Sequence, residues 1–428
     1  MYSIDPTRNR EPTVTSALST LTSSWPETLP GADPLPGQLD RWLAAHGAEL
    51  VATRRHIHAH PELSGEEFHT AELVAEKLRA AGLSPRLLPR GNGILCDIGE
   101  GDRVVGLRAD LDALPLPDTK DVPYRSTREG VAHACGHDVH TTVVLGAGLA
   151  LAQLAREGEL GGRVRLIFQP SEEKQPQGAP EMIAFGALED MSTVYALHCD
   201  PRLPVGLLGV RPGPITAAAD ILEVEIEGPG GHTSRPHLTV DLVNALSRVV
   251  TDVPALLNRR VDPRAGLVMV FGAIGAGEAA NAIPNTGFAR ATVRVLNRDV
   301  WRTLPDLVTD LVHEVLAGTG AKASVKYTRG VPPAINDRMA NAVLAGAASA
   351  ALGADQVVET EISLGGEDFA FYLDQVPGAL ARLGVGVPGS GKITDLHQSG
   401  FDVDERAIGY GVRVLVHAAL AATDLPAC

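Results

Sequence analysis

Side chains that bind metal ions are concentrated in the segment HACGHDVH, residues 133–140. Cys135 and His137 stand on either side of Gly136, and glycine lets the backbone fold tightly enough for both side chains to reach one point. A thiolate, an imidazole and nearby carboxylates together suit Zn²⁺ or a neighbouring transition metal. Two other interpretations stay open here: a buried cysteine with a capping histidine, and a cysteine nucleophile with His137 or His140 as its base.

A pair of adjacent carboxylates, Glu172 and Glu173, follows the segment FQPS at 168–171. One carboxylate of such a pair can bind a metal ion while the other removes a proton from the attacking water. Adjacent side chains point in opposite directions in a regular strand, but this pair comes after Pro170. We therefore expect a turn in which both carboxylates face the site.

Buried strands are predicted at 104–110, 163–169 and 193–199, where short aliphatic runs are separated by helical patterns. This order is typical of βαβ units and a largely parallel sheet, in which sites lie beyond the carboxyl ends of the strands. The polar residues at those ends are Asp110, Asp112, Glu172, Glu173 and His198. We expect them to converge on one site, although each alone could be a turn-capping or solvated side chain.

The chain changes character twice, which predicts two domains, one inserted into the other. Near residue 221 the segment ILEVEIEG alternates apolar and polar side chains, as a half-solvated antiparallel strand does. We therefore expect an α/β fold, in which a mostly parallel-sheet catalytic domain carries an inserted α+β domain of open-faced sandwich type, a lid or dimerisation domain. The expected boundaries are 37–213 and 331–428 for the catalytic domain, 214–330 for the insertion and 1–36 for a flexible leader.

Composition and charge argue against several classes of protein. The formal net charge of −15 excludes a basic nucleic-acid surface. The four cysteines lack paired spacing, which favours a reducing compartment over a disulfide scaffold. The N-terminus shows no export signal, and the longest uncharged apolar stretch, 140–155, is too short and too polar for a membrane span. We expect a cytoplasmic protein with neither a membrane nor a nucleic acid as partner.

Many short motifs run in order across about residues 50–410. They are RRHIH at 54, HPELS at 60, RADLDALP at 108, HACGHDVH at 133, FQPSEE at 168, ALHCDPRLPVG at 196, GPGGHTSRPH at 228, NAIPN at 281, GGEDFAFY at 365 and HQSGFDVDE at 397. Together they resemble the aminoacylase, hippurate hydrolase and auxin-conjugate hydrolase group of amidohydrolases, which is related to carboxypeptidase G2.

The resemblance implies an enzyme with two divalent metal ions per subunit, Zn, Mn or Co, that hydrolyses the amide bond of N-acyl amino acids or small peptide-like conjugates. It implies that Glu172 is the general base, which activates the water and later protonates the leaving amine. It also implies that Asp112 orients a ligand, although a turn-capping role is nearly as good an interpretation. The metal ligands that it implies are Cys135, His137, Glu173, His198 and His397.

Three further residues acquire roles through the same resemblance. His232 resembles the residue that reaches the active site of the partner subunit in a homodimer and helps to stabilise the tetrahedral oxyanion. Asn281 and Arg294 resemble the residues that bind the substrate carboxylate, although Arg294 could also be a solvated strand residue. Two alternatives remain: a non-catalytic metal-dependent binder of N-acyl amino acids, and a hydrolase with Cys135 as nucleophile.

Overall fold

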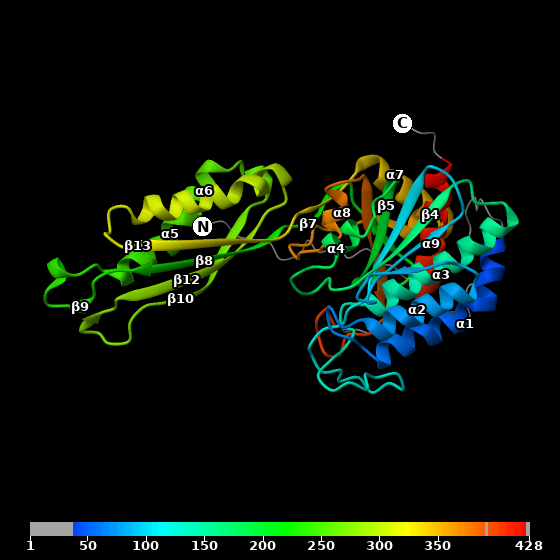
Figure 1. The fold of residues 1–428 in the computed structure, drawn as a ribbon, viewed down its shortest axis with the longest axis horizontal. Helices are drawn as coiled ribbons and strands as arrows, with labels where there is room; N and C mark the ends of the chain where they lie inside the picture. The colour runs from blue at the N-terminus through cyan, green and yellow to red at the C-terminus, as the bar shows by residue number, and fades with distance from the viewer. Residues whose placement is uncertain (1–36, 390–392, 425–428) are drawn as a thin grey trace, which may run out of the picture.

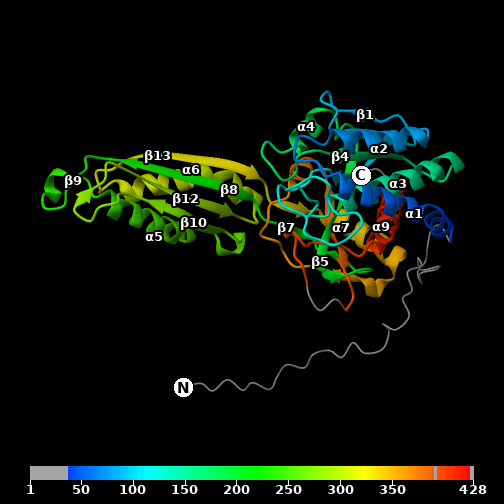
Figure 2. The same ribbon diagram turned by 90° about the horizontal axis from the view of Figure 1, so that it is seen from below.

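The computed structural model describes residues 37–389 and 393–424, so the leader expected at 1–36 lies outside the described residues. Figure 1 shows two bodies joined by a narrow neck, a larger one built on an eight-stranded sheet and an elongated one built on a four-stranded sheet. The turned view in Figure 2 shows the same separation. The predicted fold, an α/β body with an α+β insertion, is confirmed.

The larger sheet is parallel at its centre and mixed toward its edges. Its strands are β1 (Arg86–Leu87), β2 (Ile94–Ile98), β3 (Val104–Asp110), β4 (Arg163–Gln169), β5 (Met191–Pro204), β6 (Leu208–Val210), β15 (Val357–Glu359) and β16 (Gly378–Gly386). They lie in the order β1-β2-β4-β3-β5-β16-β6-β15. The four central strands β4, β3, β5 and β16 run parallel, whereas β2 and β6 pair antiparallel with their neighbours β4 and β16.

Helices cover both faces of this sheet. They are α1 (Gln38–Ala59), α2 (Phe68–Ala80), α3 (His137–Glu157), α4 (Ala179–Ala184), α7 (Arg338–Leu352), α8 (Ala370–Leu373) and α9 (Arg406–Thr423). One hydrophobic cluster joins α1, α2, α3, α7 and α9 to one face of the sheet, and a smaller one joins α4 and α8 to the other. Because side chains alternate along a strand, Leu107 of β3 faces the first layer and Arg108 lies over Phe369 in the second.

Helix α3 is the central helix of the larger body. It begins directly after Gly136, whose left-handed φ of 94° would strain other residues. With 21 residues, from His137 to Glu157, α3 meets the length and composition of a membrane span, which the core helix of a folded protein can also do. However, 83% of its most apolar window is buried inside the protein, which is typical of a core helix.

The smaller body is an open-faced sandwich. Its main elements are β8 (Ala219–Glu227), α5 (Leu242–Arg260), β10 (Val268–Gly275), β12 (Thr286–Arg294), α6 (Arg298–Leu316) and β13 (Lys322–Val331). The strands lie in the order β10-β12-β8-β13 and all pair antiparallel. Helices α5 and α6 pack on one face, and the alternating exposure along β10 shows that the other face is open. A short ribbon of β9 (Gly231–His232) and β11 (Ala282–Ile283) lies at the far end in Figure 1.

The neck between the bodies consists of short paired segments and ion pairs. Strand β7 (Gly213–Thr216) pairs with β14 (Ala334–Asn336). Across the neck, Asp374 Oδ1 lies 3.0 Å from Nε of Arg298 and 3.2 Å from Nη2 of Arg302. The predicted boundaries of the insertion, at 214 and 330, fall close to these two strands and stay predictions.

Candidate metal centre and active site

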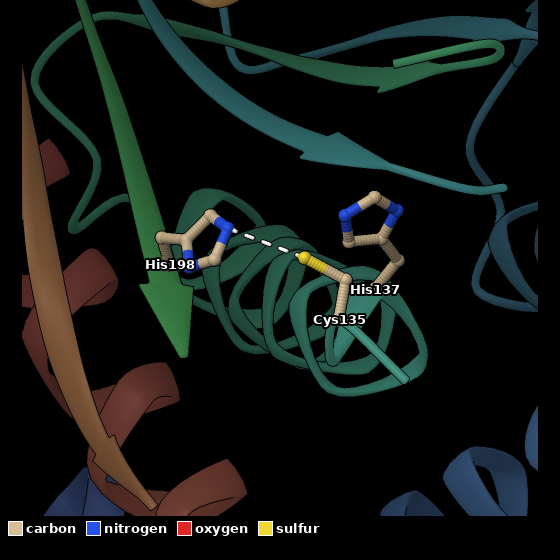
Figure 3. Close-up of side chains that lie close together, drawn as sticks. All are labelled: Cys135, His137 and His198. Atoms are coloured by element: carbon tan, nitrogen blue, oxygen red, sulfur yellow. Dashed lines mark hydrogen bonds between the residues drawn. The ribbon is translucent and has the colours of Figure 1, made fainter. Parts of the chain in front are cut away.

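Three predicted ligands come together at the start of α3 (Figure 3). Cys135 and His137 lie at the helix start, and His198 projects toward them from β5. The Sγ atom of Cys135 lies 3.6 Å from Nε2 of His198, the contact that is dashed in Figure 3. The sequence predicts His198 at the end of its strand, but β5 continues to Pro204, so His198 lies inside the strand.

Hydrogen bonds decide which nitrogen of each imidazole is free. Nδ1 of His137 lies 2.8 Å from the carbonyl oxygen of Asp112 and 3.2 Å from its Oδ1, and since both oxygens are acceptors, Nδ1 carries the proton. Nδ1 of His198 donates in the same way to the carbonyl oxygen of Cys199, at 2.8 Å. The Nε2 lone pairs are therefore left for a ligand, and Nε2 of His137 is buried without a hydrogen-bond partner among the described residues.

Glu173 and His397 form a second group with Cys135. Oε1 of Glu173 lies 3.1 Å from Nε2 of His397 and 3.8 Å from Nε2 of His137. The backbone N–H of His397 donates to the carbonyl oxygen of Ala134 at 2.7 Å, which fixes the C-terminal segment beside Cys135. The side chain of His397 is 52% exposed, so this group lies at the surface end of the cluster.

These two groups fit two metal ions that share Cys135. Within each group the possible ligand atoms all lie within 4.8 Å of one another. Burial, followed by the charge of Glu173, raises the pKa of the Cys135 thiol, so the thiolate needs a cation beside it. The orphaned Nε2 of His137 also fits a metal, because a buried nitrogen without a partner is otherwise costly.

Asp112 supports both groups. Its Oδ2 accepts hydrogen bonds from the backbone N–H of Glu173, at 2.9 Å, and from the hydroxyl of Ser64, at 2.6 Å. Its Oδ1 and carbonyl oxygen face His137, as described above. Asp112 therefore orients one ligand ring and the turn that carries another ligand, which goes beyond the turn-capping alternative.

We expect Asp112→Ala to weaken metal binding about 10- to 100-fold, because His137 and the turn of Glu173 lose their common anchor. Asp112→Asn keeps the shape and one acceptor oxygen and should lose less. Competition with a chelating dye measures the affinity, and the exposed Asp102→Ala serves as the control. Unchanged affinity in Asp112→Ala would contradict this orienting role.

His140 and Asp110 lie beside the cluster but are already engaged. Nδ1 of His140 lies 2.7 Å from Oδ1 of Asp110, and its Nε2 accepts the backbone N–H of Cys199 at 2.8 Å. With both nitrogens occupied, this imidazole has no lone pair left for a metal ion. Asp110 is also held by Nη1 of Arg108 at 2.7 Å. The pair therefore supports the cluster without belonging to either three-residue group.

Glu172 lies among other acidic side chains next to the ligands. It forms one compact group with His137 and Glu173 and another with Glu367 and Asp368. Its Oε1 accepts a hydrogen bond from the backbone N–H of Asp368 at 3.3 Å. Burial, followed by the charges of Glu367 and Glu173, raises the pKa of Glu172 well above its usual value. A carboxylate in such surroundings is suited to taking up and releasing a proton.

Arg108 is the counter-ion of this acidic cluster, and its role was missed from the sequence. Its Nη1 lies 3.2 Å from Oε1 of Glu367, and its Nη2 lies 2.5 Å from Oδ1 of Asp368. Arg108 and Asp368 are 260 positions apart in the chain. The motifs at 108 and 365 are visible in the sequence, but no short-range pattern indicates that they meet.

The contact between Cys135 and His198 is the feature that most favours a cysteine nucleophile. Burial raises the pKa of the Cys135 thiol, whereas burial and then the charge of Arg382 lower the pKa of the His198 imidazole. An activated cysteine requires a depressed thiol pKa next to a protonated base. The shift of the thiol runs in the opposite direction, although at His137 burial is outweighed by the charges of Asp110 and Cys135, which raise its pKa. The orphaned Nε2 of His137 is the geometric observation that favours metal binding by Cys135 and His137.

The remaining predicted residues lie away from the cluster. His232 and Asn281 lie together in and beside the β9–β11 ribbon, where the N–H of Thr233 donates to the carbonyl oxygen of Asn281 at 3.2 Å. Figures 1 and 2 show this ribbon at the end of the smaller body that is remote from the large sheet. Arg294 lies at the end of β12 near the neck, where its Nη1 donates to the carbonyl oxygen of Leu364.

A cluster of thiol, imidazole and carboxylate groups beside a buried carboxylate, on a parallel sheet, suits a metal-dependent hydrolase. Residues 106–421 match the family model described as Peptidase family M20/M25/M40. The chain belongs to the M20/M25/M40 peptidase family, which confirms the predicted enzyme class. It is a metal-dependent hydrolase of amide bonds in acylated amino acids or peptides, and its site takes two divalent metal ions.

Individual relatives agree with this assignment. The N-acetyl-L-cysteine deacetylase of Bacillus subtilis is 36% identical over 362 residues, covering 84% of this chain and 85% of the relative. The crystal structure of the Bacillus subtilis YXEP protein, described as a dinuclear metal binding peptidase from the M20 family, matches with a TM-score of 0.76 at 31% identity and covers 88% of this chain and 98% of that one.

One relative is a longer protein. A Rhodococcus jostii protein that carries the name glutamate–cysteine ligase 2-3 is 47% identical over 369 residues, which cover 86% of this chain. They cover 46% of the Rhodococcus protein, so the chain spans about half the length of that relative.

Proposed function

We propose that the chain hydrolyses the amide bond of N-acyl amino acids, with small peptide-like conjugates as related substrates. The observation that carries this proposal is the position of Glu172. It lies in one compact group with the proposed ligands His137 and Glu173, and it belongs to neither the group of Cys135 with His198 nor the group of Cys135 with His397. The Bacillus subtilis deacetylase, named for an N-acyl amino acid, supports this substrate class.

The proposed ligands fall into two sets. Cys135, His137 and His198 would hold one divalent ion, and Cys135, Glu173 and His397 the other, with Zn, Mn and Co all suited to these donors. Two such ions polarise the scissile carbonyl and lower the pKa of the attacking water.

Glu172 would accept the proton of the attacking water and later donate it to the leaving amine. Burial, followed by the charges of Glu367 and Glu173, raises the pKa of Glu172, which would help it to keep the proton until the amine departs. The hydrogen bond from the N–H of Asp368 holds Oε1 of Glu172 in place during both transfers.

His232 would act in the site of a partner subunit. Within one chain the β9–β11 ribbon lies far from the cluster. The exposed His232 accepts the N–H of Ser234 on Nδ1 at 3.1 Å, and its Nε2 makes no hydrogen bond to any described residue. A two-fold homodimer would carry each ribbon to the other subunit, where His232 would help to stabilise the oxyanion. Asn281, beside His232, and Arg294, at the neck, would bind the substrate carboxylate.

A substrate screen tests the proposed function. Metal-loaded protein is incubated with N-acetyl and N-benzoyl amino acids and with dipeptides, and mass spectrometry identifies the products. We expect release of free amino acid from the N-acyl substrates. Turnover confined to dipeptides would replace the proposal with a dipeptidase, and binding of N-acyl amino acids without turnover would favour the non-catalytic alternative.

The free thiols of Cys96, Cys135 and Cys199 fit the cytoplasmic location that we retain as part of the proposal.

We expect His232→Ala to lower kcat by about 10²- to 10³-fold, because the oxyanion loses a donor. A mixture of His232→Ala with Glu172→Gln should then regain roughly a quarter of the wild-type activity, since each mixed dimer would hold one intact site. The exposed His237→Ala is the matched control and should remain active. Failure of the mixture to regain activity, with mixed dimers demonstrated by mass spectrometry, would contradict action across subunits.

A further inference from the structure

Arg382 is a buried arginine without a partner. It lies in β16 and keeps 8% of its surface exposed, and its side chain makes no hydrogen bond or ion pair within residues 37–389 and 393–424. Two other buried arginines of the larger body are paired: Arg54 lies 2.7 Å from Asp138, and Arg108 lies 2.7 Å from Asp110. The free guanidinium of Arg382 therefore needs an explanation that the fold does not supply.

Strand register places Arg382 beside the metal cluster. β16 pairs in parallel with β5, and Arg382 lies directly opposite His198. Paired residues of parallel strands project from the same face of a sheet, about 4.8 Å apart. Arg382 and the ligand His198 therefore project side by side into the layer that also contains Arg108 and Glu367.

The acidic groups near Arg382 are already engaged. Glu367 and Asp200 are the carboxylates whose charges act on Arg382, although burial is the larger influence and lowers its pKa. Oε1 of Glu367 lies 3.2 Å from Nη1 of Arg108, and Oδ1 of Asp200 accepts the backbone N–H of Arg202 at 2.9 Å. Neither comes within ion-pair distance of Arg382 in the described part of the chain.

A positive charge in this place calls for an anion from outside the chain. A guanidinium keeps its charge even when it is buried, and burying it without a hydrogen-bonded anion is unfavourable although Glu367 and Asp200 act on it from a distance. Two divalent cations at the neighbouring cluster would repel it further. The planar fork of an arginine matches a carboxylate, which can accept two parallel hydrogen bonds from it.

We propose that Arg382 binds the carboxylate of the amino-acid half of the substrate, next to the ion held by His198. The inference rests on the proposed function, because it names the group of an N-acyl amino acid that binds at this point. Arg382 thereby becomes a specificity-determining residue that separates N-acyl amino acids from neutral amides of the same shape. Arg382 would share this carboxylate with Asn281 and Arg294, the residues of the inserted domain that are proposed above for the same group.

The test compares two substrates that differ only in charge, N-acetyl-L-methionine and N-acetyl-L-methioninamide. For the acid, Arg382→Leu should raise KM by about 10- to 100-fold, the loss typical of a hydrogen bond between charged groups, with kcat close to that of the wild type. For the amide, both constants should stay unchanged. Arg382→Lys keeps the charge without the fork and should lie between the two. Arg79→Leu, an exposed arginine of α2, is the control for loss of a charge.

Isothermal titration with N-acetyl-L-methionine gives a second readout, in which metal-loaded Glu172→Gln is compared with the Glu172→Gln/Arg382→Leu double variant. Binding should weaken by the same factor as KM rises.

An equal loss for acid and amide, or a fall in kcat with KM unchanged, would overturn the proposal, because Arg382 would then act on the oxyanion or on the fold. Metal content and Tm of each variant identify a folding defect, and in that case Arg382→Lys decides. If the wild type turns over neither substrate, the proposed function fails; if it turns over both equally well, only the role of Arg382 fails.

Discussion

Replacing Glu172 with glutamine is expected to lower kcat for N-acyl amino acids by roughly 10²- to 10⁴-fold, the usual contribution of a general base. Glutamine has nearly the same size, and its carbonyl oxygen can still accept the N–H of Asp368 that Oε1 accepts in the wild type. The amide cannot take up a proton, so water activation and amine protonation both lose their carrier. Steady-state kinetics on metal-loaded protein measures the effect.

The metal content of Glu172→Gln separates the base from a ligand. Glu172 belongs to neither of the two groups that share Cys135, so the variant should still bind two ions per chain. Glu173→Gln removes a proposed ligand and should lose metal and activity together. The exposed Glu181→Gln on α4 is the matched control and should retain both. Turnover at the wild-type rate in Glu172→Gln would show that another group carries the proton.

Replacing Cys135 with alanine is expected to leave fewer than two metal ions per chain and to lower activity by more than about 100-fold. The reason is that Cys135 belongs to both three-residue groups, so its loss affects both ions. Loss of a residue that only orients a ligand already costs about 10- to 100-fold, and loss of the shared ligand itself should cost more. Elemental analysis of the purified variant measures the stoichiometry.

Cys96→Ala is the control for this substitution. Cys96 lies in β2, is buried, and belongs to no metal group among the described residues; burial raises the pKa of its thiol to about 12. This variant should retain two ions per chain and wild-type kcat. If Cys135→Ala kept both ions yet lost all turnover, the cysteine would be a nucleophile rather than a ligand.

Local patterns predicted the parts of the site that lie close together in the chain. Cys135 and His137 are separated by one glycine, and the carboxylates at 172 and 173 are adjacent, so their shared chemistry is visible from spacing alone. Hydrophobic periodicity also located the helix that begins at His137 and the central strands β3 and β4 within a few residues.

Long-range contacts could not be predicted in this way. The bond from the N–H of His397 to the carbonyl oxygen of Ala134 joins segments with no common local signal, and only the resemblance to a family placed His397 at the site.

The end of strand β5 was missed for a different reason. Pro201 and Pro204 lack the N–H that a ladder needs and argue against a strand, yet β5 includes both, and Pro204 pairs with Gly386 at its end.

Charge balance in the core was also beyond the sequence. A net charge of −15 says nothing about where a positive charge is placed in the core, and the residues predicted to bind the substrate carboxylate were Asn281 and Arg294. In the structure Arg294 donates a hydrogen bond to the carbonyl oxygen of Leu364, whereas the side chain of Arg382, beside His198, has no partner in the described part of the chain. Which arginine stays free depends on the packing of β16 against β5, which no periodicity in either strand reveals.

Titration of metal-stripped protein tests the central claim most directly. The protein is treated with a chelator, dialysed, and reloaded with Zn²⁺, Mn²⁺ or Co²⁺ while hydrolysis of an N-acyl amino acid is followed. The two groups around Cys135 predict that the stripped protein is inactive and that activity rises to a plateau at two equivalents of metal per chain. Full activity in the stripped protein, abolished by alkylation of Cys135, would contradict the metal-centred account and establish the thiol enzyme in its place.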